Sequence, residues 1–104
     1  MRTLTLCRTR RKFILTLQPT TQYKKDRKLA IKRGLPMIEL DTVIGLLQEK
    51  KSLDPKYHDH ALTGNYAGFR ECHIRTDWLF IYAIDGENLI LIASHTGSHS
   101  DLFQ

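Results

Sequence analysis

The sequence predicts one small domain of the α+β class, in which a mostly antiparallel sheet carries a helical hairpin on one face and a short helix follows at the C-terminus. Three observations lead to this fold. A chain of 104 residues can bury one modest core. Two stretches of helical periodicity occupy the first half of the chain. Three short apolar stretches, separated by turn residues, occupy the second half, so the element order is β-α-α-β-β-β.

The first strand is expected in KFILTL, residues 12–17. Phe13, Leu15 and Leu17 occupy alternate positions there, which is the period of a strand with one buried face. Pro19 follows shortly afterwards and ends the strand, because a proline has no N–H to donate to a sheet.

Two helices follow the first strand. Thr20 or Thr21 is a suitable N-cap for the first helix, which continues through YKKDRKLAIKR and ends at Gly34. The second helix begins after Pro36 and spans residues 37–51, where apolar residues recur at helical spacing. Since only a few residues link the two helices, they are expected to form an antiparallel hairpin.

Three strands are expected after a long polar connection, residues 52–66, of a kind that often carries function. The strands are residues 68–74, 78–84 and 87–93. Asp85-Gly86, between the last two, is a typical sequence for a two-residue hairpin turn. Both strands of this hairpin are apolar at nearly every position, so they belong in the centre of the sheet.

The two-residue turn also predicts which residues face each other across the hairpin. It pairs Trp78 with Ala93. It also pairs Thr76 with His95. A second tight turn, between the first two of these strands, would set His73 opposite Trp78. His73, Trp78 and His95 would then lie at one end of one sheet face.

The C-terminal segment HTGSHSDLF predicts a strand end, a turn and a short helix. His95 ends the strand, and Ser98 with Asp101 fits the N-cap and N3 positions of the helix. His99 then lies in the first turn of that helix, where free backbone N–H groups favour a bound phosphate.

The charge is strongly polarised along the chain, although the net charge is only +5. Residues 1–33 contain eleven Lys and Arg residues and one Asp, a balance of +10, so the remainder carries −5. A basic segment attracts polyanions such as RNA. A solvated helix face or an acidic protein partner would explain the same charge.

Composition and cysteine spacing exclude several classes of protein. With 41% hydrophobic residues, the chain is too apolar to be disordered. It has no apolar run that could span a bilayer and no secretory signal, so we expect a cytoplasmic protein with no membrane partner. Cys7 and Cys72 lie far apart and form no CxxC motif, which argues against a disulfide framework and against a zinc site.

All five histidines lie after residue 57, and their clustering has three interpretations. They are surface residues with no catalytic or binding role, they bind a metal ion, or they transfer protons as general acid and base. A metal site would combine His58 and His60 with His73 or His99, but no HExxH or CxxC motif supports it.

Aromatic and basic residues lie among these histidines. Trp78 and Phe103 are either packing residues or platforms on which RNA bases stack. Arg70 and Arg75 either neutralise phosphate charge or pair with carboxylates.

Two stretches resemble a known family: YHDHALTGNYAGFRECHIRTDWLFIY, residues 57–82, and HTGSHSDLF, residues 95–103. Together they are similar to toxins of the RelE/ParE superfamily, in the YafQ-like branch of bacterial type II toxin–antitoxin systems. The resemblance covers residues 12–103. It implies one RelE-like domain in residues 12–104, preceded by a basic N-terminal extension, residues 1–11.

The resemblance implies an enzyme, a ribosome-dependent mRNA endoribonuclease (mRNA interferase) that cuts mRNA in the ribosomal A site without a metal or other cofactor. In this reaction the ribose 2′-OH attacks the adjacent phosphate and leaves a cyclic phosphate and a free 5′-OH. The implied partners are ribosomal RNA, mRNA and a cognate antitoxin, through which the complex binds operator DNA. The alternative within the superfamily is a non-catalytic ParE-like module that inhibits gyrase.

The resemblance also implies roles for particular residues. The catalytic set is His60, His73, Asp77 and His99, and the substrate-binding set is Arg70, Arg75, Trp78, His95 and Phe103. His60 is expected to be the base and His99 the acid. Asp77 would orient a histidine or share the role of base, and His73 would stabilise charge. His95 stands where relatives often carry an arginine.

Overall fold

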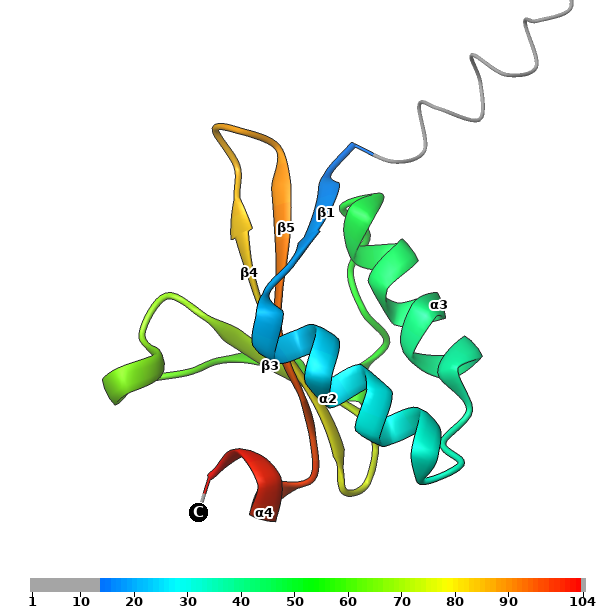
Figure 1. Cartoon of the computed structure of the whole chain (residues 1–104). Coiled ribbons are helices and arrows are strands. Elements are labelled where there is room, and N and C mark those ends of the chain that lie inside the picture. Colours follow the sequence, from blue (N-terminus) through cyan, green and yellow to red (C-terminus); the bar gives the residue numbers. More distant parts are fainter. Residues whose placement is uncertain (1–13, 104) are drawn as a thin grey trace, which may run out of the picture.

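The computed structural model of the protein describes residues 14–103 and contains one five-stranded sheet (Figure 1). The strands are β1 (Thr16–Pro19), β2 (His60–Ala61), β3 (Arg70–Arg75), β4 (Trp78–Asp85) and β5 (Ile90–Gly97). They lie in the order β1-β5-β4-β3-β2, with β1 parallel to β5 and the other pairs antiparallel. The predicted α+β class with a mostly antiparallel sheet is confirmed.

Part of the N-terminal prediction lies outside the described residues. The basic extension, residues 1–11, lies there together with Cys7 and the start of the strand expected in residues 12–17. The domain division at residue 11 therefore stays a prediction. Strand β1 begins later than expected and includes Pro19, which is tolerated because β1 is an edge strand.

Helices α2 (Thr21–Lys32) and α3 (Met37–Gln48) lie on one face of the sheet (Figure 1). Thr20 caps α2, because its hydroxyl accepts the N–H of Tyr23. The helix ends before Gly34, whose φ of 79° lies in the left-handed region that favours glycine. The two predicted helices are both present, although α3 ends earlier than the sequence pattern suggested.

One hydrophobic core fills the space between the helices and the sheet. Its buried members are Leu15, Tyr23, Leu40, Val43, Ile44, Leu47, Cys72, Ile74, Trp78, Phe80, Tyr82, Leu91 and Ala93. Cys72 is fully buried, and burial raises the pKa of its thiol to about 12. Among residues 14–103, no helix has the length and apolar character needed to cross a membrane.

The turn between β4 and β5 differs from the prediction. It contains four residues, Gly86–Leu89, and the strand pairing closes with Asp85 opposite Ile90. The carboxylate of Asp85 accepts two backbone N–H groups from within the turn. The side chain of Asp85 therefore stabilises a longer loop than the two residues that its Asp-Gly sequence suggested.

The longer turn changes the residues that meet across the hairpin. Ala93 lies opposite Tyr82 and not opposite Trp78. His95 lies opposite Ile81, and the register shifts by one residue between these two pairs. Both predicted pairings were wrong, because the register of a hairpin depends on the length of its loop.

The three residues predicted to share a sheet face are divided between both faces. His73 lies opposite Leu79, and Trp78 lies opposite Arg75. Side chains alternate along a strand, so His73 and His95 point away from the helices, whereas Trp78 points into the core. The prediction placed Trp78 on the wrong face because a one-residue slip exchanges the two faces.

The polar connection before β3 is ordered by two 3₁₀ turns, η1 (Pro55–Tyr57) and η2 (Gly64–Tyr66). Asp54 caps η1, and His58 follows it with a φ of 49°. This left-handed residue turns the chain into β2, which pairs with the start of β3. At the other end of the chain, β5 leads into helix α4 (His99–Leu102).

Candidate active site

Imidazole rings from three segments meet on the side of the sheet away from α2 and α3. His73 comes from β3, His58 and His60 come from the preceding connection, and His99 comes from α4. The centroid of the His73 ring lies 5.4 Å from that of His58, 6.4 Å from that of His60 and 5.7 Å from that of His99. We call these four residues, which are centred on His73, the histidine row.

A buried carboxylate supports the histidine row. Glu71 precedes His73 by two positions on β3, so both side chains point to the same face. Only 5% of Glu71 is exposed, and its Oε1 lies 3.2 Å from Nε2 of His60 and 3.7 Å from Nε2 of His73. Glu71 was not predicted as a site residue. Its position two residues before His73 in the strand sequence RECHI does indicate that the two side chains share a face.

His60 is held at both ring nitrogens. Its Nδ1–H donates to the carbonyl oxygen of His58 at 2.7 Å, which leaves Nε2 facing Glu71. The bond made at one nitrogen determines the role of the other. Both ring nitrogens of His60 therefore face oxygen acceptors, which fix the position of the ring.

His99 is oriented by Asp77 through two bonds. The Oδ1 atom of Asp77 accepts the backbone N–H of His99 at 3.0 Å and lies 2.7 Å from its ring Nδ1. The backbone bond, followed by the ring bond, lowers the pKa of Asp77 below its ordinary value. A carboxylate at Nδ1 keeps a proton on that nitrogen, so Nε2 of His99 is the reactive position.

Helix α4 is held by a capping box and an ion pair. The hydroxyl of Ser98 accepts the N–H of Asp101, whose carboxylate accepts the N–H of Ser98. Arg33, at the end of α2, donates to the same carboxylate at 2.7 Å. The bond to Arg33 and then that to Ser98 lower the pKa of Asp101 to about 2. The capping box is confirmed, but the backbone N–H of His99 is occupied by Asp77, so it does not favour a phosphate as expected.

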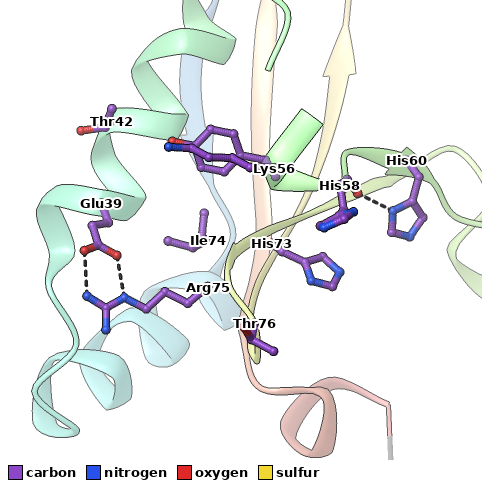
Figure 2. Close-up of a pocket in the computed structure, with 10 residues that line it drawn as sticks. Glu39, Thr42, Lys56, His58, His60, His73, Ile74, Arg75 and Thr76 are labelled. Carbon is purple, nitrogen blue, oxygen red and sulfur yellow. Dashed lines mark hydrogen bonds and ion pairs between the residues drawn. The ribbon is translucent and has the colours of Figure 1, made fainter. Parts of the chain in front are cut away.

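The histidine row borders an open groove of about 920 Å³. Figure 2 shows His58, His60 and His73 at one end of this groove and helix α3 at the other. The full lining consists of Glu39, Thr42, Lys56, Tyr57, His58, His60, His73, Ile74, Arg75 and Thr76. The groove extends the site well beyond the imidazoles.

A second cluster, of aromatic rings, surrounds His95. The ring of Tyr66 lies 6.1 Å from His95 and 5.7 Å from Phe103. Nδ1 of His95 is hydrogen-bonded to the hydroxyl of Ser94 at 2.7 Å. Two predicted substrate-binding residues, His95 and Phe103, are thus brought together by Tyr66, which was not predicted as a site residue. Phe103 is 42% exposed, which leaves its ring accessible to a base.

Trp78 is not placed to touch a substrate. It is 2% exposed, and its Nε1–H donates to the hydroxyl oxygen of Thr96 at 3.0 Å. The hydroxyl of Thr96 donates in turn to the carbonyl of Leu79. The indole joins two neighbouring strands inside the core, and this burial contradicts the predicted contact with an RNA base.

The two arginines predicted to bind phosphate are both paired with carboxylates. Arg70 lies 3.0 Å from Asp59 and does not line the groove, so the structure does not bring it to the site. Arg75 does line the groove, and its guanidinium bonds the carboxylate of Glu39 through two contacts of 2.7 Å. Of the two, only Arg75 lines the groove.

Imidazoles backed by carboxylates, on an open face beside a groove, can move protons on a bound molecule. Together with the small sheet, this arrangement defines the class of protein as a small α+β domain with a groove lined at one end by histidines. The particular family follows from the whole chain. This chain belongs to the YafQ family of bacterial toxins of type II toxin–antitoxin systems, and the family model matches its residues 15–104.

Known relatives agree with this membership. The mRNA interferase toxin YafQ of Escherichia coli K12 is 39% identical over 83 residues, which cover 79% of this chain and 88% of that protein. The chain also matches the crystal structure of the E. coli DinJ–YafQ toxin–antitoxin complex. That match has a TM-score of 0.79 and 35% identity, and it covers 88% of this chain and 99% of the other.

A metal-bound toxin from Helicobacter pylori is similar as well, with a TM-score of 0.81 and 39% identity over 86% of this chain and 99% of the other. Within residues 14–103 of this protein, no group of three or more His, Cys, Asp or Glu side chains is arranged to hold a metal ion. We therefore assign no metal ligands and derive no step through a metal.

Proposed function

We propose that this protein is the toxin of a type II toxin–antitoxin system and acts as an mRNA interferase, an endoribonuclease that cleaves mRNA. Membership of the YafQ family supports this, as do two E. coli relatives named mRNA interferase toxin, at 39% and 36% identity. The single observation that carries the proposal is the position of His99. Its ring is hydrogen-bonded to Asp77, and its ring centroid lies 5.7 Å from that of His73. The relatives' names favour a nuclease over the ParE-like gyrase inhibitor.

The two ends of the histidine row supply the two proton transfers of RNA cleavage. The His60–Glu71 pair takes the proton of the ribose 2′-OH as general base, and Nε2 of His99 gives a proton to the departing 5′ oxygen as general acid. The bond from the 2′ oxygen to phosphorus forms while the bond from phosphorus to the 5′ oxygen breaks. The products are a cyclic phosphate and a free 5′-OH.

The other two residues of the catalytic set assist these transfers. Asp77 orients His99 rather than acting as base, because its Oδ1 atom is already engaged with the backbone and the ring of His99. His73 lies between the acid and the base and stabilises the extra negative charge on the phosphate. Phe103, with His95 beside Tyr66, offers an exposed ring for a neighbouring base.

The partners that we propose are the ribosome, mRNA in its A site, and a cognate antitoxin that joins the toxin to operator DNA, all in the cytoplasm. Exposed lysines on α2, Lys24, Lys25 and Lys28, support an encounter with ribosomal RNA. The similarity to an E. coli relative crystallised with its antitoxin supports the protein partner.

A translation reaction tests the function, with mRNA 5′ ends mapped in the presence and absence of the protein. The wild type is expected to create new 5′ ends only on messages that ribosomes are translating. His99→Ala is expected to reduce cleavage by about 10²–10⁴-fold, the usual contribution of a general acid. Ser100→Ala, the exposed neighbouring position on α4, is the matched control and is expected to cleave normally.

Two results would contradict this proposal. Wild-type cleavage by a folded His99→Ala variant would remove the assigned acid. Growth arrest with intact messages and broken DNA would instead favour a gyrase inhibitor.

A further inference from the structure

We propose that the part of the groove beyond His73 is a second nucleotide subsite, which binds the RNA nucleotide next to the cleaved bond. The inference rests on the proposed ribonuclease function and adds to it a position for the neighbouring nucleotide. The base lies beside the ring of Tyr57, and a phosphate meets the ammonium group of Lys56.

The size of the groove is the first argument. At about 920 Å³ it lies within the range of roughly 300–1,000 Å³ that holds ligands of about twenty or more heavy atoms, whereas the reacting phosphate has only a few. Histidines line one end only, and α3, the η1 turn and the end of β3 line the rest (Figure 2). An RNA strand whose phosphate lies at the histidine row can therefore continue directly into this space.

The lining has the mixed character that a nucleoside requires. Tyr57 is half-buried and offers an aromatic ring beside which a base can lie, whereas Ile74 belongs to the core and is 8% exposed. Thr42 and Thr76 line the same space.

The charge of the groove also suits a phosphate. The exposed Nζ of Lys56 lies 5.2 Å over the ring of Tyr57. Among residues 14–103 Lys56 takes part in none of the ion pairs, whereas Arg75 is engaged with Glu39. Lys56 is therefore a cation without an ion pair in this part of the chain, and it lies at the wall of a groove that begins at the histidines.

The test is steady-state cleavage of ribosome-bound messages that carry each of the four nucleotides in turn on either side of the cleaved bond. Two variants probe the subsite. Thr42→Trp places an indole in the groove from an exposed position on α3, and Lys56→Gln removes the charge. Both are expected to raise KM about tenfold, the effect of losing one stacking or phosphate contact, and to change kcat less than about twofold.

Further readouts separate a nucleotide subsite from a general loss of affinity. Thr42→Trp is expected to abolish the preference for one flanking nucleotide while the cleaved bond stays the same. Lys56→Gln is expected to reduce the slope of log KM against log salt by about one. Lys50→Gln, which removes an equal charge outside the groove, is the matched control and should keep the wild-type KM.

The outcomes are distinct. An unchanged KM and flanking preference in Thr42→Trp, with its fold confirmed by circular dichroism, would overturn the subsite and leave the cleavage activity standing. An unchanged KM accompanied by weaker antitoxin binding would overturn it too, because the groove would then be a protein interface. A wild-type protein that cleaves no message would overturn both proposals.

Discussion

Replacing Trp78 with phenylalanine distinguishes a core residue from a substrate-binding residue. The variant keeps a ring in the core but loses the indole N–H that donates to Thr96, together with part of the side-chain volume. The lost hydrogen bond costs about 1 kcal/mol and the space left behind adds about 1–2 kcal/mol. We therefore expect the free energy of unfolding to fall by about 2–3 kcal/mol, which lowers the Tm by roughly 10 °C or more.

The assay for this variant combines urea denaturation with cleavage kinetics at a temperature where both proteins are folded. Because Trp78 is 2% exposed and faces away from the histidine row, kcat and KM are expected to stay within about twofold of wild type. Phe103→Ala provides the contrast, since its exposed ring should contribute to KM and little to stability. Wild-type stability together with lost cleavage in Trp78→Phe would refute the core assignment.

Three further predictions concern the acid, its support and the core. Asp77→Asn is expected to lower kcat about 100-fold while stability changes little, and NMR of His99 should show a changed ring tautomer. The pKa of Asp101 is lowered from 3.8 to about 2, so its contribution to stability is present above pH 4 and is lost as the pH falls towards 2. Arg33→Gln should therefore reduce the fall in the free energy of unfolding between pH 4 and pH 2. An unchanged fall over this range would contradict the prediction. The thiol of Cys72 should resist iodoacetamide at pH 8 until urea unfolds the protein, as read from the mass of its peptide, whereas rapid labelling of folded protein would show an open core.

Local patterns in the sequence were enough to determine the elements and the family. The helices could be located because the caps and the spacing of apolar residues act within a few positions of the chain, as with Thr20, Gly34 and the stripe on α3. The capping box of Ser98 and Asp101 is equally local and was predicted correctly. The motifs that surround His60, His73 and His99 pointed to the family that comparison of the whole chain then showed.

Only the tertiary structure decided which of these residues meet. The carboxylate of Asp85 stabilises a four-residue turn, and the hairpin register shifts again before His95, so Trp78 lies in the core and not beside the histidines. Glu71 joins the site because β2 brings His60 over it. Each of these outcomes depends on contacts between residues far apart in the chain, and a shift of one residue in a strand exchanges the buried face for the open one.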